Sequence, residues 1–325
     1  MESSDMKDAG KPPEIAVIGS GLMGHGIAQV FAQGDCRVRL QDVDKHALQT
    51  ADSRIRANLK ALSEHELEDP ARIDAIMSKI ATTTDLAEAL RDVDFVIESA
   101  PEDIRVKTEL FRRIESFAPD DAILASNTSM LKVSDIGVLI EKKERLIVTH
   151  WFNPPYLMPV VEVVKGAHTS QDTMDRTIDL LRRMGKVPIK VLKEVPGHLL
   201  NRIQFAMFRE TIGLLEQGVA TAEEIDKGVS GSLGLRLATI GPLKSIDLAG
   251  IDLFWYGMRD LYRSLDNSQE PQHIIRDKVR EGAFGRKSGK GFFDYEAGDF
   301  MYGQEQERDE KTMALLKILY QKKGA

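Results

Sequence analysis

The sequence predicts an α/β protein in which a doubly wound, mainly parallel β-sheet is followed by an all-helical second domain. Short β-branched runs alternate with helical stretches as far as residue 192, as in parallel sheets covered by helices on both faces. The first run ends in a glycine-rich turn that opens a helix. After residues 193–197, KEVPG, the strand patterns stop and helical periodicity continues. These three observations put the sheet first and the helical domain second.

The strand candidates are short apolar runs with polar or glycine-rich borders. We expect strands at residues 14–19, 37–42, 93–99, 122–126, 145–150, 160–164 and 187–192. The main helical patterns cover residues 22–33, 45–67, 199–217 and 305–323. The pattern at 199–217 is apolar on more than one face, which suits a core helix or a subunit contact. Ligands of such sheets bind at the carboxyl ends of the strands, so functional residues are expected there.

The length of 325 residues exceeds one typical domain core and favours two domains. Residues 1–13 contain acids and no apolar core, so we expect a disordered leader there and neither a secretory nor a transit signal. We place the α/β domain at residues 14–195 and the helical domain at residues 196–325.

Composition excludes several classes of function. With 42% hydrophobic residues, 29% charged residues and no apolar run of membrane length, the chain is typical of globular proteins that do not span a membrane. The net charge of −7 argues against nucleic acid or an anionic membrane as main partner and favours a small-molecule substrate. The single cysteine, Cys36, excludes a disulfide framework or a cysteine metal cluster, so we predict no metal and a cytoplasmic location.

The glycine-rich turn matches the pattern G-x-G-x-x-G between a strand and a helix. Its residues are Gly19, Ser20, Gly21, Leu22, Met23 and Gly24. Gly19 permits the tight turn, Gly21 lets the backbone approach a pyrophosphate, and Gly24 allows close packing of helix and strand. The context favours a Rossmann-type dinucleotide site over a glycine turn without a ligand.

Asp42 ends the second predicted strand at about the 20-residue separation expected of an acid that binds a ribose 2′-hydroxyl. A carboxylate there repels a 2′-phosphate, so NAD is predicted rather than NADP, and Asp44 adds to that repulsion. The alternative for either aspartate is a helix cap. Arg37 and Arg39 weaken the prediction if they turn toward the site.

His150 closes a predicted strand, and Glu162 interrupts an apolar one. A buried carboxylate needs a partner, and a chain reversal through residues 153–155 can return Glu162 to His150. Such a carboxylate fixes the imidazole tautomer and leaves the other nitrogen to take a proton from a substrate hydroxyl. The alternative is a structural histidine.

Further polar residues fall near predicted strand ends or on apolar helix rows. Residues 126–129, SNTS, follow a strand and suit either a substrate or a helix cap. Asn201 heads an apolar row and needs a partner. Lys107 shares a helical row with apolar residues, and by spacing alone a surface ion pair with Asp103 is the favoured interpretation.

Several segments together resemble the NAD-dependent 3-hydroxyacyl-CoA dehydrogenases. They are VIGSGLMGHGIAQVFA, PEDIRVKTELF, SNTS, HWFNPPYLMPVVEV, VPGHLLNRIQ and FGRKSGKGFFDY, in the family's order. The resemblance implies a Rossmann-type domain that binds NAD, a helical domain that forms a homodimer, and a role in fatty acid metabolism.

The resemblance also implies residue roles. His150 is the implied general base and Glu162 its orienting carboxylate. Ser129 and Asn201 are implied contacts of the substrate hydroxyl. The implied cofactor contacts are Glu102, Lys107, Ser129, Asn153 and Lys287.

Two segments depart from the pattern of fatty-acid members. Residues 158–162 read MPVVE where a Lys-Leu pair is usual, and LGLRLATIGPLKSIDLAG replaces a shorter glycine-rich pattern. Both are more similar to relatives that use substrates without CoA, such as gulonate, carnitine or pyridine-alcohol dehydrogenases. Arg236 then becomes a candidate for binding a substrate carboxylate, against the alternative of a surface arginine. A further alternative is a non-catalytic, crystallin-like protein that binds the dinucleotide.

Overall fold

The computed structural model describes residues 11–295 and 303–320, which divide into two compact units. The sheet unit ends at Asn201 and the helical unit begins at Arg202. The predicted domain boundary between residues 195 and 196 stays a prediction. Most of the predicted leader, residues 1–10, lies outside the described residues.

The sheet unit contains eight strands in the order β3-β2-β1-β4-β5-β6-β7-β8. All neighbouring strands run parallel except β6 and β7, which are antiparallel. The strands are β1 (Glu14–Ile18), β2 (Arg37–Gln41), β3 (Ile80–Thr83), β4 (Phe95–Glu98), β5 (Ile123–Ser126), β6 (Leu146–Trp151), β7 (Val160–Val164) and β8 (Val187–Val191). The strand order reverses between β1 and β4, where a doubly wound sheet opens a crevice for a ligand.

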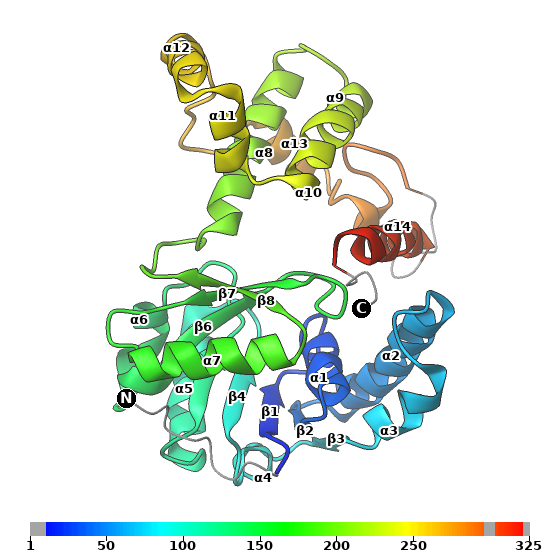
Figure 1. Cartoon of the computed structure of the whole chain (residues 1–325), viewed down its shortest axis with the longest axis vertical. Helices are drawn as coiled ribbons and strands as arrows, with labels where there is room; N and C mark the ends of the chain where they lie inside the picture. Colours follow the sequence, from blue (N-terminus) through cyan, green and yellow to red (C-terminus); the bar gives the residue numbers. More distant parts are fainter. Residues whose placement is uncertain (1–10, 296–302, 321–325) are drawn as a thin grey trace. The chain divides into compact units, whose positions relative to one another are not determined.

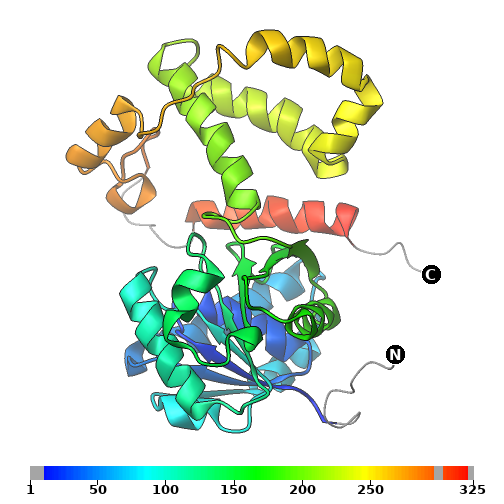
Figure 2. The same ribbon diagram turned by 90° about the vertical axis from the view of Figure 1, so that its left-hand side faces the viewer.

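Helices cover both faces of this sheet (Figure 1). One apolar core joins the sheet to α1, α2, α3 and α7, and a second joins its other face to α4, α5 and α6. Figure 2 shows the strands between these two layers. The helices are α1 (Gly24–Gln33), α2 (Lys45–Glu64), α3 (Ile73–Met77), α4 (Leu86–Leu90), α5 (Ile104–Phe117), α6 (Val133–Ile136) and α7 (Gln171–Arg183). The predicted doubly wound α/β fold is confirmed.

The strand β3 was not predicted from the sequence. Its residues read IATT, and none of the four is fully buried, because β3 lies at the edge of the sheet beside β2. An exposed edge strand needs no continuous apolar run, so it lacks the pattern by which the other strands were found.

The helical unit continues from α8 (Leu200–Glu216), as the periodicity predicts. Among its described residues from 202 to 295, the buried ones are Gly213 and Gly291. Large apolar side chains such as Leu243, Leu253 and Trp255 are more than 60% exposed. The other helices are α9 (Ala222–Gly228), α10 (Leu235–Thr239), α11 (Pro242–Ala249), α12 (Ile251–Leu261), α13 (His273–Arg280) and α14 (Gly303–Leu319). One chain alone therefore leaves this unit with little apolar core.

None of the helices within residues 11–295 and 303–320 has both the length and the apolar composition that a membrane span requires.

Candidate active site

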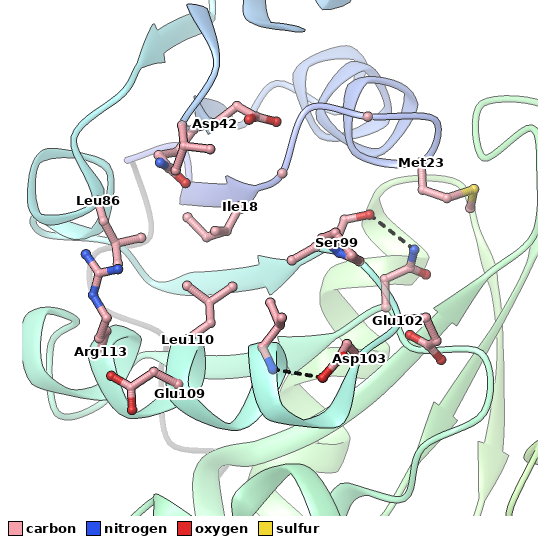
Figure 3. A pocket seen from close by; sticks show the side chains of 18 of the residues that line it. Ile18, Met23, Asp42, Leu86, Ser99, Glu102, Asp103, Glu109, Leu110 and Arg113 are labelled. Carbon is pink, nitrogen blue, oxygen red and sulfur yellow. Dashed lines mark hydrogen bonds between the residues drawn. The ribbon is translucent and has the colours of Figure 1, made fainter.

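A cleft of about 1080 Å³ opens at the carboxyl ends of the parallel strands (Figure 3). It is lined by the glycine-rich turn after β1, the end of β2, the loops after β4 and β5, and one side of α5. The predicted residues among its lining are Gly19, Gly21, Leu22, Met23, Asp42, Glu102 and Ser129. The structure therefore brings these seven residues together at the predicted edge of the sheet.

The glycine positions fit a dinucleotide. Gly19 has a φ of +98°, and a Cβ there would lie 2.6 Å from the carbonyl oxygen of Ser99. A Cβ on Gly24 would lie 1.7 Å from the carbonyl oxygen of Gly19. A Cβ on Gly21 would meet nothing within 4 Å, so this backbone faces open space beside the cleft. Gly19 and Gly24 make the turn possible, and Gly21 leaves room for a phosphate to approach.

Asp42 follows β2 and is tied to the glycine-rich turn. Its Oδ2 accepts hydrogen bonds from the backbone N–H and the hydroxyl of Ser20, each at 2.8 Å. Asp44 caps α2 by accepting from the N–H of His46, so the cap interpretation fits Asp44. Arg37 and Arg39 both pair with Glu14, at 3.2 and 3.5 Å. The arginines that could favour a 2′-phosphate are thus engaged elsewhere.

The polar residues of the loop after β5 have different roles. Asn127 and Ser129 line the cleft, and Asn127 accepts a hydrogen bond from the N–H of Trp151 at 2.9 Å. Thr128 stabilises the local turn by accepting from the N–H of Leu131 at 3.0 Å. Glu102 accepts from the N–H groups of Ser129 and Met130, at 3.0 and 3.1 Å, and thereby fixes this loop.

The prediction of a surface ion pair between Lys107 and Asp103 is wrong. Asp103 instead caps α5, and the Lys107 side chain is 1% exposed. Its ammonium donates to Glu98 at 2.6 Å and to the carbonyl oxygen of Ala100 at 3.1 Å, and it lies 3.4 Å from Glu102. Glu98 ends a buried strand, so helix spacing could not reveal it as the partner.

His150 and Glu162 lie opposite each other in the antiparallel pair β6 and β7. Nδ1 of His150 is 2.6 Å from Oε2 of Glu162. A carboxylate can only accept, so Nδ1 carries the hydrogen and Nε2 is the nitrogen that can take a proton from a substrate. The contact predicted from the sequence is present.

The hydrogen bonds of the second Glu162 oxygen explain why a carboxylate occupies this apolar strand. Oε1 accepts from the N–H groups of Leu199 and Leu200, at 2.9 and 2.8 Å, where α8 begins. Burial by itself raises the pKa of Glu162, but the hydrogen bonds from His150, Leu200 and Leu199 outweigh it and hold the pKa below its ordinary value. Glu162 therefore stays ionised and joins the sheet to the helix.

Asn201 has the partner that the sequence required. Its side-chain amide donates to the carbonyl oxygen of Ser129 at 3.0 Å. His198, which was not predicted as a site residue, is fully buried with its ring centre 5.5 Å from that of His150. Its Nε2 donates to the carbonyl oxygen of Thr128 at 3.1 Å, and burial lowers its pKa. The sequence signal was a histidine beside a glycine at a helix start.

Of three further predicted residues, one follows β6 and two belong to the helical unit. Asn153 is exposed and precedes Pro154 through a cis peptide bond. Arg236 is an exposed residue of α10, and Lys287 lies over the ring of Phe284 at 5.4 Å, both in the helical unit. Their cofactor and substrate contacts stay predictions.

Comparison with known proteins gives two adjoining matches. Residues 14–195 match the family model described as 3-hydroxyacyl-CoA dehydrogenase, NAD binding domain, and residues 197–295 match its C-terminal domain. The chain belongs to the 3-hydroxyacyl-CoA dehydrogenase family. It is accordingly an NAD-dependent oxidoreductase that acts on a CH–OH group of a small molecule.

The names of relatives in this family state different substrates. The 5-formyl-3-hydroxy-2-methylpyridine 4-carboxylate 5-dehydrogenase of Mesorhizobium japonicum is 34% identical, over 94% of this chain and 97% of that protein. The 3-hydroxybutyryl-CoA dehydrogenase of Clostridioides difficile is 35% identical, over 87% and 99%. A crystal structure of a dehydrogenase of the first kind has a TM-score of 0.90 at 33% identity, over 96% of this chain and all of that one.

The lowered pKa of Glu162 predicts how stability depends on pH. A carboxyl group with a depressed folded-state pKa contributes stability above its unfolded value, 4.5, and loses it as the pH falls through the folded value. Urea unfolding should therefore show Glu162→Gln less stable than the wild type at neutral pH, by a difference that shrinks below pH 4.5. The exposed Glu64→Gln is the control, with little difference at any pH. A Glu162→Gln deficit that stays constant into acid would contradict the assignment.

Proposed function

We propose that the enzyme interconverts a hydroxyl and a carbonyl group with His150 as the general acid and base. The observation that carries this proposal is the buried 2.6 Å contact between His150 and Glu162. Glu162 holds the imidazole so that Nε2 faces the substrate hydroxyl and takes its proton during oxidation. NAD, when bound, supplies the hydride acceptor. Ser129 and Asn201 hold the substrate hydroxyl, a role supported by the hydrogen bond from the Asn201 amide to the backbone carbonyl oxygen of Ser129, which keeps the two residues together.

The base assignment predicts a loss of turnover without a loss of cofactor binding. His150→Ala should lower kcat by at least ~100-fold, because general acid-base catalysis contributes about that much or more. The affinity for NADH, measured by fluorescence titration, should change little, since the glycine-rich turn and Asp42 are untouched. His168→Ala, at an exposed histidine of the same unit, is the control. Full turnover by His150→Ala would refute the role.

For the substrate, we propose a 3-hydroxyacyl-CoA, such as 3-hydroxybutyryl-CoA, and the corresponding 3-oxoacyl-CoA. The two family matches and the 3-hydroxybutyryl-CoA dehydrogenase relatives support a thioester. A second candidate is a hydroxy carboxylate or related alcohol without CoA. The nearly end-to-end match with the pyridine-carboxylate dehydrogenase supports it, as do the departures at residues 158–162 and around Arg236.

Parallel assays separate these two candidates. Acetoacetyl-CoA and free acetoacetate should be assayed by the consumption of NADH. The aldehyde 5-formyl-3-hydroxy-2-methylpyridine 4-carboxylate should be assayed by the formation of NADH from NAD⁺, because dehydrogenation of an aldehyde reduces the cofactor. We expect turnover with acetoacetyl-CoA and at least ~100-fold lower kcat/KM with acetoacetate, because an enzyme uses binding energy from remote parts of its substrate. Turnover confined to either free acid would instead establish a substrate without CoA and would make Arg236 the first carboxylate contact to test.

We also propose that the enzyme is a homodimer through its helical domain. The near absence of buried residues between 202 and 295, with exposed apolar side chains on α11 and α12, supports a second copy as the cover. The single, buried Cys36 supports a reducing, cytoplasmic location, and a thioester substrate would place the enzyme in fatty acid metabolism.

The dimer proposal predicts that a charge in the apolar surface separates the subunits. Sedimentation of the wild type should give the mass of two chains, and Trp255→Glu should shift it toward one chain, since Trp255 is 64% exposed in the single chain. Lys60→Glu on α2 reverses a charge on the sheet unit and should leave the mass unchanged. A wild-type protein that sediments as one chain would refute the proposal.

A further inference from the structure

Glu98, at the end of β4, has a fully buried side chain whose carboxylate has a partner on each of three segments. Oε1 accepts from the Lys107 ammonium of α5 and from the N–H of Ala100, both at 2.6 Å. Oε2 accepts from the hydroxyl of Ser126, at the end of β5, also at 2.6 Å. One carboxylate thus connects the two strand-end loops and the helix that border the cleft.

Lys107 is shared between two carboxylates. Its ammonium lies 2.6 Å from Glu98 and 3.4 Å from Glu102, and Glu102 lines the cleft with 38% of its side chain exposed. The neighbouring Asp103 and Arg105 neutralise each other at 3.2 Å. The carboxylates of Glu98 and Glu102 carry two negative charges and the Lys107 ammonium carries one positive charge, so the cleft wall at Glu102 has a net negative charge.

This wall is at the reacting end of the cleft. Figure 3 shows Glu102 and Asp42 on opposite sides of it, and Asp42 marks the side of the adenosine ribose. Asn127, which also lines the cleft, accepts from the N–H of Trp151, the residue after His150. The nicotinamide must be near the proposed base for the reaction to occur, so it belongs on the Glu102 side.

We propose that Glu98 and Lys107 are positioning residues that hold Glu102 as a negatively charged wall, and that this wall favours bound NAD⁺ over NADH. The nicotinamide ring is a cation in NAD⁺ and neutral in NADH, so a nearby negative charge stabilises the oxidised form selectively. The placement of the nicotinamide on the Glu102 side of the cleft rests on the function proposed above, whereas the binding of NAD itself does not. Glu98 has no need to touch the cofactor, because it acts through Lys107 and Glu102.

The test is the ratio of dissociation constants for NAD⁺ and NADH, measured by calorimetry without substrate. Glu98→Gln removes one negative charge and keeps an acceptor oxygen, so it should raise Kd(NAD⁺)/Kd(NADH) by about three- to tenfold, as a unit charge near the ring would. Glu102→Gln, at the cleft wall, should raise the same ratio. This second variant keeps the buried Glu98–Lys107 pair, so it tests the proposal even where Glu98→Gln does not fold. Glu109→Gln removes a charge from α5 at a position Figure 3 shows far from Glu102, and should leave the ratio unchanged.

If Glu98 and Glu102 had only a structural role, their substitution would weaken the binding of NAD⁺ and of NADH equally. That result for the folded Glu98→Gln and Glu102→Gln variants would overturn the proposal. An equal change of the ratio in Glu109→Gln would overturn it too, since overall charge would then explain the effect. Failure of the proposed function is a separate outcome, because it would appear as full turnover in His150→Ala and would not alter these binding ratios.

Discussion

The structure around the candidate active site depends on the two oxygens of one buried carboxylate, that of Glu162. The antiparallel register of β6 and β7 sets one oxygen against His150, and the other oxygen accepts from the first amides of α8. An unpaired carboxylate would cost several kcal/mol at this depth, so each of these partners is needed. Because α8 carries Asn201, the same residue that orients the imidazole also fixes the start of the helix that reaches Ser129.

Charged groups at the ends of the other strands follow the same arrangement, in which each carboxylate connects its own strand to a neighbouring loop. Asp42 connects β2 to the turn after β1, and Glu98 connects β4 to the end of β5. Parallel strands point their carboxyl ends to one edge, so these contacts converge there and shape the cleft without a contribution from the strand interiors. The apolar cores on the two faces hold the strands, and the polar edge carries the candidate active site.

Much of this could be predicted from the sequence, because strong local patterns marked it. Seven strands had apolar runs, Gly19 and Gly24 stood in a recognisable spacing, and the lone Glu162 in an apolar strand demanded a partner. The missed features had weak or misleading patterns. β3 is an exposed edge strand, and Lys107 had an apparent partner one helical turn away although its true partner, Glu98, lies on a strand. His198 reaches His150 only through the tertiary fold.

The hydrogen bonds between Asp42 and Ser20 constrain how this enzyme could change its cofactor. In the proposed cofactor site, a shift from NAD to NADP requires the loss of the Asp42 carboxylate, which would repel a 2′-phosphate, but Asp42 also accepts from the backbone and the hydroxyl of Ser20 within the glycine-rich turn. Removing the carboxylate would leave two donors of that turn without their acceptor. In the proposed site, cofactor discrimination and the shape of the turn therefore depend on the same carboxylate, and a variant that accepts NADP must redesign positions 20 and 42 together.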